Sequence, residues 1–484
     1  MGAQIPSAKI IVDGKKLDSI SGKKMKTVNP FTNETLAEIP ECDQQDVQVA
    51  VEAAKSARQK LSNMTVFERS QMLYNIADKI EENKEELAKT LSMEVGKVYH
   101  TEALGEVTAA IQGFRNVAEQ VKWIEGSTIQ MEDPKKRTFN FYQPKGTYAV
   151  ITPFNFPVNI ATEYIAPGLA AGNTIVLLPS PTTSYTTIRF VEIIHEASIP
   201  SGVVNVITGP GHIIGDELVS HPDINGIGFT GSTPTGKKIA ERAAGKAQIM
   251  ELGGNGPTIV LEDANIEKVA ESIFYGCFVC AGQTCSAAER ILVHESIQEE
   301  LAQKLVERVK KIRLGDPLDQ KTTMGPLHAE HIAKKMDRHV EDAIHKGAKL
   351  IYGGKRVPGF NTKLLYEPTI LINCSRDSLV NLEETFGPIA PMIPFKTHEE
   401  ALEISMDGNF GLLASVYTNN PKYAFYFGEK LRTGIVNIND HSNYWEVHVP
   451  FGGASGTKSG NSRIGGLQMI KQMSDLKTIV WDLS

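Results

Sequence analysis

Hydrophobic residues in the first part of the chain recur at the spacing of amphipathic helices. Residues 43–61 begin with a capping side chain, and residues 66–91 place apolar side chains at near-helical intervals. A helix with one apolar face buries that face against other elements. The pattern therefore predicts two packing helices, over residues 43–61 and 66–91.

Beyond Gly146 the pattern changes to short apolar runs separated by helical stretches. The runs are residues 147–151, 174–178, 203–207 and 224–229. Intervals of roughly 25 to 30 residues are typical of βαβ units with a parallel sheet. In such sheets ligands bind beyond the carboxyl ends of the strands, so the loops that follow the runs are the places to look for a site.

A second alternating stretch begins near Pro257. Its apolar runs are residues 258–261, 290–293, 413–417 and 434–439, and helical patterns at 296–312 and 329–346 separate some of them. We predict a second α/β domain from this stretch. The boundary falls near Leu252-Gly253-Gly254, which puts Glu251 where clefts between domains commonly form.

Two segments fit neither domain. Residues 127–145 are interpreted as an extended excursion around Asp133-Pro134, and residues 476–482 as a terminal strand. Strands with exposed edges pair readily with another chain. We therefore expect a homo-oligomer, a dimer or a tetramer.

The composition narrows the class of partner. The chain has 484 residues, of which 41% are hydrophobic, and a formal net charge of -7. The length indicates more than one domain, and the negative charge argues against a nucleic-acid or membrane-surface partner. The sequence has no apolar run long enough to cross a membrane and no secretory signal at its start. We expect a small-molecule partner and a cytoplasmic location.

The five cysteines are odd in number and sparse, which argues against a disulfide framework. Cys277 and Cys280 have the spacing of half a zinc site, but no second Cys or His pair stands at a matching interval. We therefore expect no metal site and interpret Cys277 and Cys280 as core residues.

Two short motifs offer a thiol and a carboxylate to one site. Gly282-Gln283-Thr284-Cys285 follows Glu251-Leu252-Gly253-Gly254 by about one supersecondary unit. A thiolate is a strong nucleophile near neutral pH, and a carboxylate beside two glycines can approach what the thiol binds. For a lone cysteine the alternative, a buried residue that packs as a small hydrophobe, is the more common case.

Two loops are candidates for phosphate binding. Residues 209–215 are glycine-rich and precede a helix, but their third glycine lies one position beyond the usual dinucleotide motif. Residues 230–234 follow a strand, and Pro234 suits the first turn of the next helix, whose backbone amides can bind phosphate. An ordinary capped helix is the alternative.

Six motifs span nearly the whole chain. They are Thr152-Pro153-Phe154-Asn155-Phe156-Pro157, Phe229-Thr230-Gly231-Ser232, Glu251-Leu252-Gly253-Gly254, Gly282-Gln283-Thr284-Cys285, Glu384-Thr385-Phe386-Gly387-Pro388 and Pro450-Phe451-Gly452-Gly453. In order and spacing the set resembles the aldehyde dehydrogenase superfamily, and most of all its glyceraldehyde, lactaldehyde and non-phosphorylating glyceraldehyde-3-phosphate dehydrogenase branch. The resemblance implies an α/β fold with two Rossmann-like domains plus a small β oligomerisation element.

The same resemblance implies a division of the chain. Residues 1–126 and 147–252 would form the cofactor-binding domain, and residues 253–449 the catalytic domain. Residues 127–146 and 467–484 would form the oligomerisation element.

Covalent catalysis follows from the resemblance as well. In this family the thiolate matching Cys285 attacks the aldehyde carbonyl, and the amide matching Asn155 donates to the oxygen where negative charge develops. Hydride leaves for the nicotinamide, and the carboxylate matching Glu251 activates water to hydrolyse the resulting thioester. Relatives that transfer the acyl group to coenzyme A generally lack this carboxylate, so the expected product is a free acid.

The implied cofactor is NADP, with NAD possible. The expected cofactor contacts are Ile151, Thr152, Pro153, Phe154, Ser180, His212, Gly231, Ser232, Leu252, Glu384 and Phe386. Many relatives have Lys and Glu where this chain has Leu178 and Pro181. Losing the Glu removes repulsion against a 2′-phosphate, whereas losing the Lys removes a phosphate partner. We favour NADP because a carboxylate excludes the phosphate actively and neighbouring donors could replace the Lys.

Near the thiol the chain differs from the family pattern at two positions, and these differences affect the expected substrate and the expected general base. Phosphate-using relatives have Arg where this chain has Thr284, so we expect a short unphosphorylated hydroxyaldehyde such as glyceraldehyde or lactaldehyde. Ile464 stands near the place of a second family carboxylate, which leaves Glu251 as the principal base. The alternatives are a succinate-semialdehyde-like dehydrogenase, a non-phosphorylating glyceraldehyde-3-phosphate dehydrogenase, or a catalytically silent binding protein on this fold.

Four residues before the last motif either line the substrate entrance or form a solvated loop: His441, Asn443, Tyr444 and Trp445.

Overall fold

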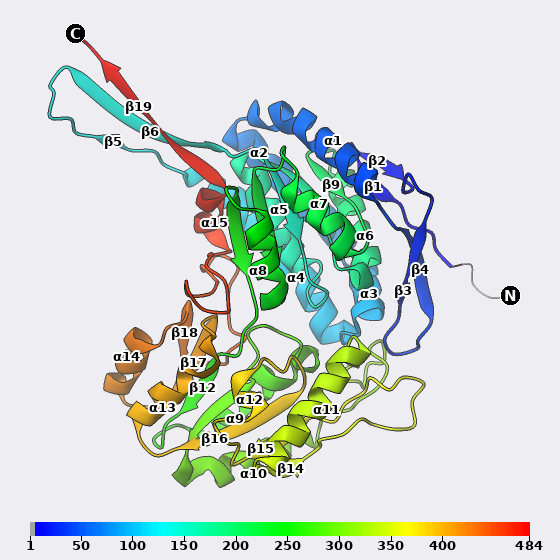
Figure 1. Ribbon diagram of the computed structural model, residues 1–484, viewed down its shortest axis with the longest axis vertical. Coiled ribbons are helices and arrows are strands. Elements are labelled where there is room, and N and C mark those ends of the chain that lie inside the picture. The colour runs from blue at the N-terminus through cyan, green and yellow to red at the C-terminus, as the bar shows by residue number, and fades with distance from the viewer. Residues whose placement is uncertain (1–4) are drawn as a thin grey trace.

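Two α/β lobes and a projecting arm make up the computed structural model, which describes residues 5–484 (Figure 1). The first lobe is built on a seven-stranded sheet of order β11-β10-β7-β8-β9-β1-β2, and the second on a seven-stranded sheet of order β14-β15-β16-β13-β12-β17-β18. The arm is a three-stranded sheet of order β19-β6-β5. The predicted α/β class with two Rossmann-like sheets is confirmed.

The central strands of the first sheet are parallel, as the spacing of the apolar runs predicts. Two antiparallel strands, β1 and β2, extend one edge, and β3 pairs with β4 beside it. No pattern in the sequence predicts these four strands, because each is short or carries few apolar residues. The strands are β1 (Ile10–Val12), β2 (Lys15–Leu17), β3 (Lys24–Val28), β4 (Thr35–Pro40), β7 (Thr147–Ile151), β8 (Thr174–Leu178), β9 (Val204–Val206), β10 (Gly226–Thr230) and β11 (Ala247–Glu251).

Helices pack on both faces of this sheet. The predicted helix over residues 66–91 is wrong in one respect, because it breaks at Asn83, which ends α2 and begins α3. The Asn83 side chain donates to the Lys79 carbonyl oxygen (2.9 Å), a local bond that competes with continued helix. The helices are α1 (Gln44–Ser62), α2 (Val66–Glu82), α3 (Lys84–Val95), α4 (Leu104–Gln120), α5 (Asn159–Ala171), α6 (Ser184–Glu196), α7 (Asp216–Ser220) and α8 (Thr233–Arg242).

The second sheet is parallel except for β14 at its edge. Its strands are β12 (Pro257–Val260), β13 (Arg290–His294), β14 (Lys349–Tyr352), β15 (Thr369–Ile372), β16 (Ile389–Phe395), β17 (Leu413–Tyr417) and β18 (Ile435–Ile438). Its helices are α9 (Ile266–Phe278), α10 (Gln298–Val309), α11 (Glu330–His345), α12 (Leu379–Leu382), α13 (His398–Ser405) and α14 (Pro421–Lys430). The four predicted strands match β12, β13, β17 and β18 and the two predicted helices match α10 and α11, whereas β14, β15 and β16 were not predicted.

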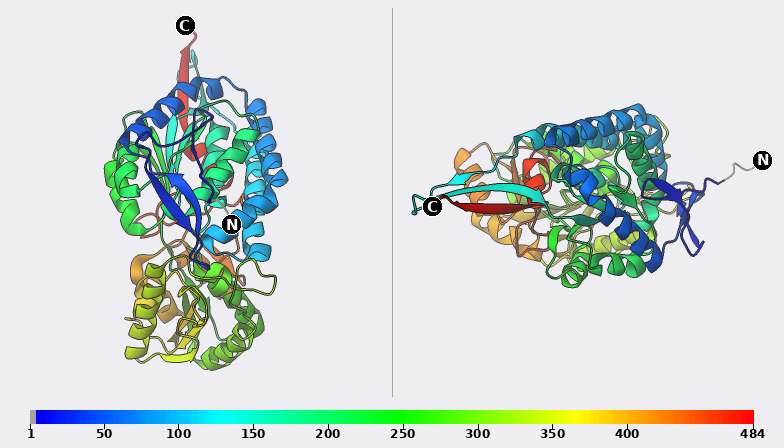
Figure 2. Two further views of the ribbon diagram at one scale, coloured as in Figure 1. Left: turned by 90° about the vertical axis from the view of Figure 1, so that its right-hand side faces the viewer. Right: turned by 90° about the horizontal axis from the view of Figure 1, so that it is seen from above.

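The arm joins the two segments that fit neither domain. β5 (Thr128–Ile129) and β6 (Lys136–Pro144) form a hairpin, and β19 (Ser474–Asp482), which follows α15 (Gly466–Gln472), pairs antiparallel with β6 along its whole length. Figure 2 shows from two further sides that the arm extends away from the first lobe, with the C-terminus near its tip. The excursion and the terminal strand were both predicted, but their pairing with each other was not.

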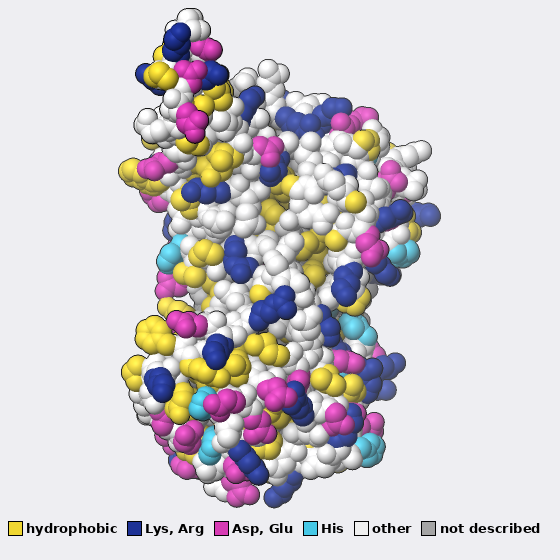
Figure 3. All heavy atoms as spheres, turned by 60° about the vertical axis from the view of Figure 1, so that its left-hand side comes forward, with side chains coloured by type: hydrophobic (Ala, Val, Ile, Leu, Met, Phe, Trp, Pro, Cys, Tyr) yellow, Lys and Arg dark blue, Asp and Glu magenta, His cyan; other side chains and the backbone are white. Residues whose placement is uncertain are grey.

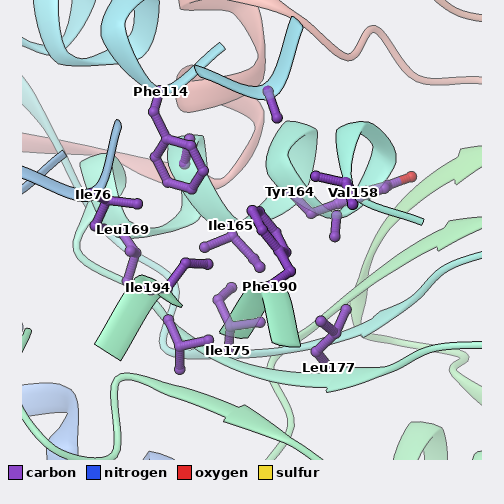
Figure 4. Close-up of a cluster of buried hydrophobic side chains, with 14 of the residues drawn as sticks. Ile76, Phe114, Val158, Tyr164, Ile165, Leu169, Ile175, Leu177, Phe190 and Ile194 are labelled. Carbon is purple, nitrogen blue, oxygen red and sulfur yellow. The ribbon is translucent and has the colours of Figure 1, made fainter. Parts of the chain in front are cut away.

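A continuous apolar core lies between the first sheet and helices α2 to α6. Figure 4 shows Phe114 of α4, Tyr164 of α5 and Phe190 of α6 gathered over Ile175 and Leu177 of β8. This packing fixes α5, and with it the loop of residues 152–157 that connects β7 to α5. Within residues 5–484, no helix is long and apolar enough to cross a membrane.

Candidate active site

The loops at the carboxyl ends of the parallel strands converge on one cavity of about 610 Å³, which we call the central cavity. Loops after β7, β8, β10 and β11 reach it from the first lobe, and Cys285 and Glu384 reach it from the second. This is the place that a parallel sheet predicts for a ligand. The predicted site residues that line it are Thr152, Pro153, Phe154, Asn155, Ser180, Gly231, Ser232, Leu252, Cys285, Glu384 and Phe386.

A second hollow of about 460 Å³, the side cavity, lies next to the central cavity. Thr235 lines both. The side cavity holds the two remaining predicted contacts, Ile151 and His212, together with Leu178 and the cations Lys238 and Arg242. His212 comes from the glycine-rich segment, which forms a single wide turn at Gly211–Gly215 and runs directly into α7.

Two glycines allow the segment that carries Cys285 and the Glu384 carboxyl to approach the end of β11 closely. A Cβ on Gly254 would lie 1.8 Å from the Cys285 carbonyl oxygen, and a Cβ on Gly253 would lie 2.9 Å from Glu384 Oε2. The Gly254 backbone N–H donates to Glu384 Oε1 over 2.9 Å. Neither glycine can carry a side chain without displacing a neighbour, so the spacing in Glu251-Leu252-Gly253-Gly254 has a steric cause.

Cys285 is half-buried and faces the central cavity, unlike Cys277 and Cys280, which are buried in the core as predicted. Burial raises the pKa of the Cys285 thiol well above its usual range, and the nearby Glu384 and Glu251 raise it further. The thiol is therefore protonated in this arrangement, and a nucleophilic role would require it to lose its proton first. The structure has no cluster of three or more metal-ligating side chains within residues 5–484.

Asn443 holds the residues on either side of the thiol. Its Oδ1 accepts hydrogen bonds from Thr284 Oγ1 (3.1 Å) and Ser286 Oγ (2.7 Å), and its Nδ2 donates to the Tyr275 carbonyl (3.1 Å). Of the four residues predicted to line an entrance, Asn443 thus contacts the segment that carries Cys285. Trp445 packs on Phe451, and Tyr444 is exposed.

Asn155 contacts the segment that carries Cys285. Its side chain is buried, and Nδ2 donates one hydrogen bond to the Gln283 carbonyl oxygen over 2.9 Å. An amide carries two N–H donors, so the second remains available to an oxygen in the central cavity. The Gln283 bond fixes the direction in which this donor points.

Glu251 ends β11 and is buried. Oε1 accepts a hydrogen bond from Ser462 Oγ over 3.0 Å, whereas Oε2 is buried with no hydrogen-bond partner in residues 5–484. Burial raises the pKa of this carboxyl well above its usual range, against the lowering effect of the Ser462 bond. In this orientation burial favours the protonated form of the carboxyl.

Phe386 is held in a strained conformation at the cavity wall. Its φ of 63° lies in the left-handed region, and the buried Glu289 carboxyl accepts the backbone N–H groups of Thr385 (2.6 Å) and Phe386. The Phe386 ring meets Phe154 edge-on, with centroids 5.9 Å apart. Phe154 in turn stacks on His328, with centroids 4.4 Å apart.

Sequence reasoning missed several residues of this wall. Glu289 and His328 act behind Phe386 and Phe154, and His331 and Lys335 of α11 line the central cavity. Burial lowers the pKa of His328 to about 4, so its ring is neutral. No spacing in the sequence links these residues to the six motifs, because α11 reaches the cavity only through the fold.

Two parallel sheets whose carboxyl ends meet at one cavity define a class, the α/β enzymes that bind a ligand between nucleotide-binding-type domains. The profile of the aldehyde dehydrogenase family matches residues 17–479. The chain belongs to this family, and it is an NAD(P)-dependent oxidoreductase that oxidises aldehydes.

Several known proteins align with this chain over nearly its whole length. A lactaldehyde dehydrogenase of Methanocaldococcus jannaschii is 37% identical over 97% of this chain and 99% of its own. A glutarate-semialdehyde dehydrogenase of Pseudomonas putida is 38% identical over 96% of both chains. The crystal structure of an NADP-dependent enzyme of Escherichia coli superposes with a TM-score of 0.95, at 35% identity, over 99% of this chain and 98% of that one.

The residues present fit a dinucleotide. Helix α8 begins beside Ser232 with Pro234 in its first turn, so its free backbone N–H groups face the central cavity and suit a phosphate. Thr152 Oγ1 is buried without a partner in residues 5–484, which leaves a hydroxyl for a ligand. The adjoining side cavity extends the space at the end where Leu178 and His212 lie.

Proposed function

We propose that the protein oxidises a short unphosphorylated hydroxyaldehyde, such as glyceraldehyde or lactaldehyde, to the carboxylic acid with NADP or NAD. The observation that carries the proposal is that neutral side chains flank the thiol in the sequence: Thr284 and Ser286 both donate to Asn443, so neither neighbour of Cys285 is a cation. A phosphorylated substrate needs cationic partners near its phosphate. The similarity to a lactaldehyde dehydrogenase supports the same substrate class.

In the proposed mechanism the Cys285 thiolate attacks the aldehyde carbon, and Asn155 Nδ2 stabilises the developing oxyanion with its free N–H. A preorganised donor of this kind lowers a barrier by roughly 3 kcal/mol. Bound NAD(P) supplies the hydride acceptor, for which Glu384, Phe386 and Lys335 line the central cavity. Glu251 then activates water against the Cys285 thioester, which requires its carboxyl to be ionised and turned toward the thiol.

A glutarate- or succinate-semialdehyde dehydrogenase is the second candidate. The glutarate-semialdehyde relative is as similar in sequence as the lactaldehyde relative, and both align over nearly the whole chain. A non-phosphorylating glyceraldehyde-3-phosphate dehydrogenase has less support, because Thr284 offers no charge to a phosphate.

The proposal also assigns a role to each part of the chain. Residues 1–126, of which 1–4 lie outside the described part, and residues 147–252 would bind the cofactor, and residues 253–449 would carry the nucleophile. Residues 127–146 and 467–484 would join protomers of a dimer or tetramer. NADP is the favoured cofactor and a cytoplasmic location stays a prediction.

A panel of aldehydes crossed with both cofactors tests this function. Steady-state kcat/KM is measured from the absorbance of the reduced cofactor with glyceraldehyde, lactaldehyde, glyceraldehyde 3-phosphate, succinate semialdehyde, glutarate semialdehyde and propionaldehyde. We expect the two hydroxyaldehydes to exceed the others by about tenfold or more. A larger kcat/KM with either semialdehyde overturns the substrate assignment. Cys285→Ala should abolish activity with every aldehyde, and Cys374→Ala, which alters a remote core thiol, should not.

A further inference from the structure

The backbone makes a left-handed turn immediately before the segment that carries the thiol. Helix α9 ends at Phe278, and Cys280, Ala281 and Gly282 have φ values of 53°, 52° and 72°. Glycine adopts this region freely, but Cys280 and Ala281 carry a Cβ that crowds the backbone there, so both are strained. Such strain persists only where the surroundings hold it in place. The turn ends three residues before Cys285, so the contacts that hold it also set where the thiol lies.

One carboxyl group from the other lobe holds this turn. Glu102 Oε1 accepts the backbone N–H of Cys280 over 2.7 Å, and Glu102 Oε2 accepts the backbone N–H of Val98 over 2.8 Å. Glu102 belongs to a single wide helical turn, Tyr99–Ala103, that Val98 precedes and that packs with the core of the first lobe. The carboxyl therefore ties the segment before Cys285 to the helices of the first lobe.

Gln283 holds the same turn at its other end. The backbone N–H and Nε2 of Gln283 both donate to the Cys280 carbonyl oxygen, over 3.1 and 3.0 Å. The carbonyl oxygen of Gln283 in turn accepts Asn155 Nδ2 over 2.9 Å. The Cys280 residue is thus held at its N–H by Glu102 and at its carbonyl by Gln283. A shift of Cys280 would therefore displace the Asn155 amide as well as the thiol.

A carboxyl group suits this position because both of its oxygens accept hydrogen bonds. Burial raises the pKa of Glu102, whereas the backbone N–H groups of Cys280 and Val98 and the charge of Lys97 lower it. A carboxyl oxygen keeps lone pairs in either protonation state, so both hydrogen bonds can form whether or not the group is ionised. An amide offers one accepting oxygen instead of two, and a leucine side chain of similar size offers none.

We propose that Glu102 is a positioning residue for the nucleophile: it holds the strained left-handed turn at Cys280 and Ala281 and so keeps Cys285 and the Asn155 amide aligned for attack on an aldehyde. Glu102 acts through the backbone of the turn. This inference rests on the proposed function, in which Cys285 is the nucleophile, but not on which aldehyde is oxidised. The contribution is geometric, so it belongs to the rate of the first chemical steps rather than to the affinity for the cofactor.

The test removes the carboxyl and then relieves the strain. Glu102→Leu removes both acceptors, and Ala281→Gly lets the left-handed turn form without a crowded Cβ. Stopped-flow absorbance measures the rate and the amplitude of cofactor reduction in the first turnover, with the aldehyde of highest kcat/KM in the panel above and the better of NADP and NAD. The amplitude counts the competent sites, so the rate is independent of any fraction that fails to fold.

Glu102→Leu should slow the first turnover about tenfold or more, because a left-handed residue with a Cβ is unfavourable once its anchor is lost. Glu102→Gln keeps one acceptor and should lie between Glu102→Leu and the wild type. Ala281→Gly should change the wild-type rate by less than about twofold but raise the rate of Glu102→Leu about threefold or more. The Kd of the reduced cofactor, measured from its fluorescence, should stay within about twofold of the wild type in every variant.

Two substitutions serve as matched controls. Ala53→Gly makes the same change in the right-handed helix α1, where no positive φ is relieved, and should not restore Glu102→Leu. Glu307→Gln, an exposed carboxyl on α10, should behave as the wild type.

The outcomes separate this inference from the proposed function. A wild-type first turnover in Glu102→Leu would overturn the inference, and so would a slow Glu102→Leu that Ala281→Gly restores no better than Ala53→Gly does. If Cys285→Ala kept most of the first-turnover rate, the nucleophile itself would be wrong, and the proposed mechanism would fail together with the role of Glu102. A preference for a semialdehyde would overturn the substrate assignment alone, because this test uses whichever aldehyde is oxidised best.

Discussion

Ser462 Oγ lies 3.0 Å from Glu251 Oε1 and 2.9 Å from the Met250 carbonyl oxygen, so one buried hydroxyl contacts both the side chain of Glu251 and the strand that carries it. Two glycines make this approach feasible. A Cβ on Gly452 would lie 2.5 Å from Glu251 Oε1, and a Cβ on Gly460 would lie 2.0 Å from the Met250 carbonyl oxygen. Ser462 belongs to the segment in which the chain departs from the family pattern.

Ser462→Ala tests whether this hydroxyl tunes Glu251. Because the hydrogen bond favours the charged carboxylate, its loss should raise the pKa of Glu251 further, which lowers the ionised fraction at a given pH. The rise of steady-state kcat with pH should then move upward by about one pH unit, with kcat several-fold lower at pH 7 and partly restored at higher pH. Ser455→Ala, in an exposed loop, is the control. An unshifted pH profile would show that Ser462 has only a structural role.

Glu251→Gln should separate the two halves of the reaction. An amide cannot accept the proton of the attacking water, so thioester hydrolysis should slow by about a hundredfold or more. Cofactor reduction in the first turnover should remain, since it precedes hydrolysis. Stopped-flow absorbance measures the burst of reduced cofactor against the steady-state rate, and Glu262→Gln, an exposed carboxyl, serves as the matched control. Steady-state turnover at the wild-type rate would remove Glu251 from the role of base.

Lys97→Met should destabilise the first lobe. The Lys97 ammonium lies 2.6 Å from Glu106 Oε2 and 3.2 Å from the centroid of the Phe156 ring, and both charged side chains are buried. Removing Lys97 leaves the buried Glu106 charge with backbone N–H donors but without its counter-ion, which costs about 3–5 kcal/mol. The loss appears as a lower midpoint of thermal or denaturant unfolding. Lys79→Met, in an exposed ion pair, should leave the midpoint unchanged. Equal midpoints for the two variants would contradict the assigned importance of the buried pair.

Pro181→Glu should shift the cofactor preference toward NAD. Ser180 and Pro181 follow β8 and line the central cavity, where many relatives carry a carboxylate. A negative charge there repels a 2′-phosphate, so the ratio of kcat/KM with NADP to that with NAD should fall by about tenfold. Pro181→Gln introduces a side chain of the same shape as Glu but without the charge, and it should change the NADP to NAD ratio little. If Gln and Glu lower the ratio equally, the effect comes from the loss of proline rather than from charge.

How far the sequence predicts the fold depends on the kind of signal. Strands β7 to β10 of the first sheet and β12, β13, β17 and β18 of the second lie close to the predicted apolar runs, because a buried parallel strand needs uninterrupted hydrophobic residues. The break at Asn83 escaped prediction because Leu87 and Leu91 continue the spacing of α2 across it. The pairing of β6 with β19 also escaped, since the two strands lie more than 300 residues apart and no local pattern links them.

The functional site, like the fold, could be predicted from the sequence only in part. Cys285, Glu251 and Glu384 stand in short motifs whose glycines have a visible purpose, so the sequence could place them together. Glu289, His328 and Lys335 stand in no motif, and only the fold brings them to the cavity wall. The protonation of Glu251 could not be predicted from the sequence either, because burial raises its pKa and the Ser462 hydrogen bond lowers it, and both arise only from the fold.

Val480→Asp should weaken assembly if the arm joins protomers. β19 is an edge strand of a projecting sheet, and it exposes Leu476, Val480 and Trp481 by 54%, 55% and 62% of their surfaces. Figure 3 shows hydrophobic side chains among the charged ones on this arm. Apolar side chains on an unpaired edge are unfavourable in water, and covering them with another chain is favourable. A buried charge at Val480 should therefore lower the mass measured by light scattering at a given concentration. Phe67→Asp, at a still more exposed apolar site on α2, is the control. An unchanged mass for Val480→Asp, with a wild type larger than a monomer, would place the interface elsewhere.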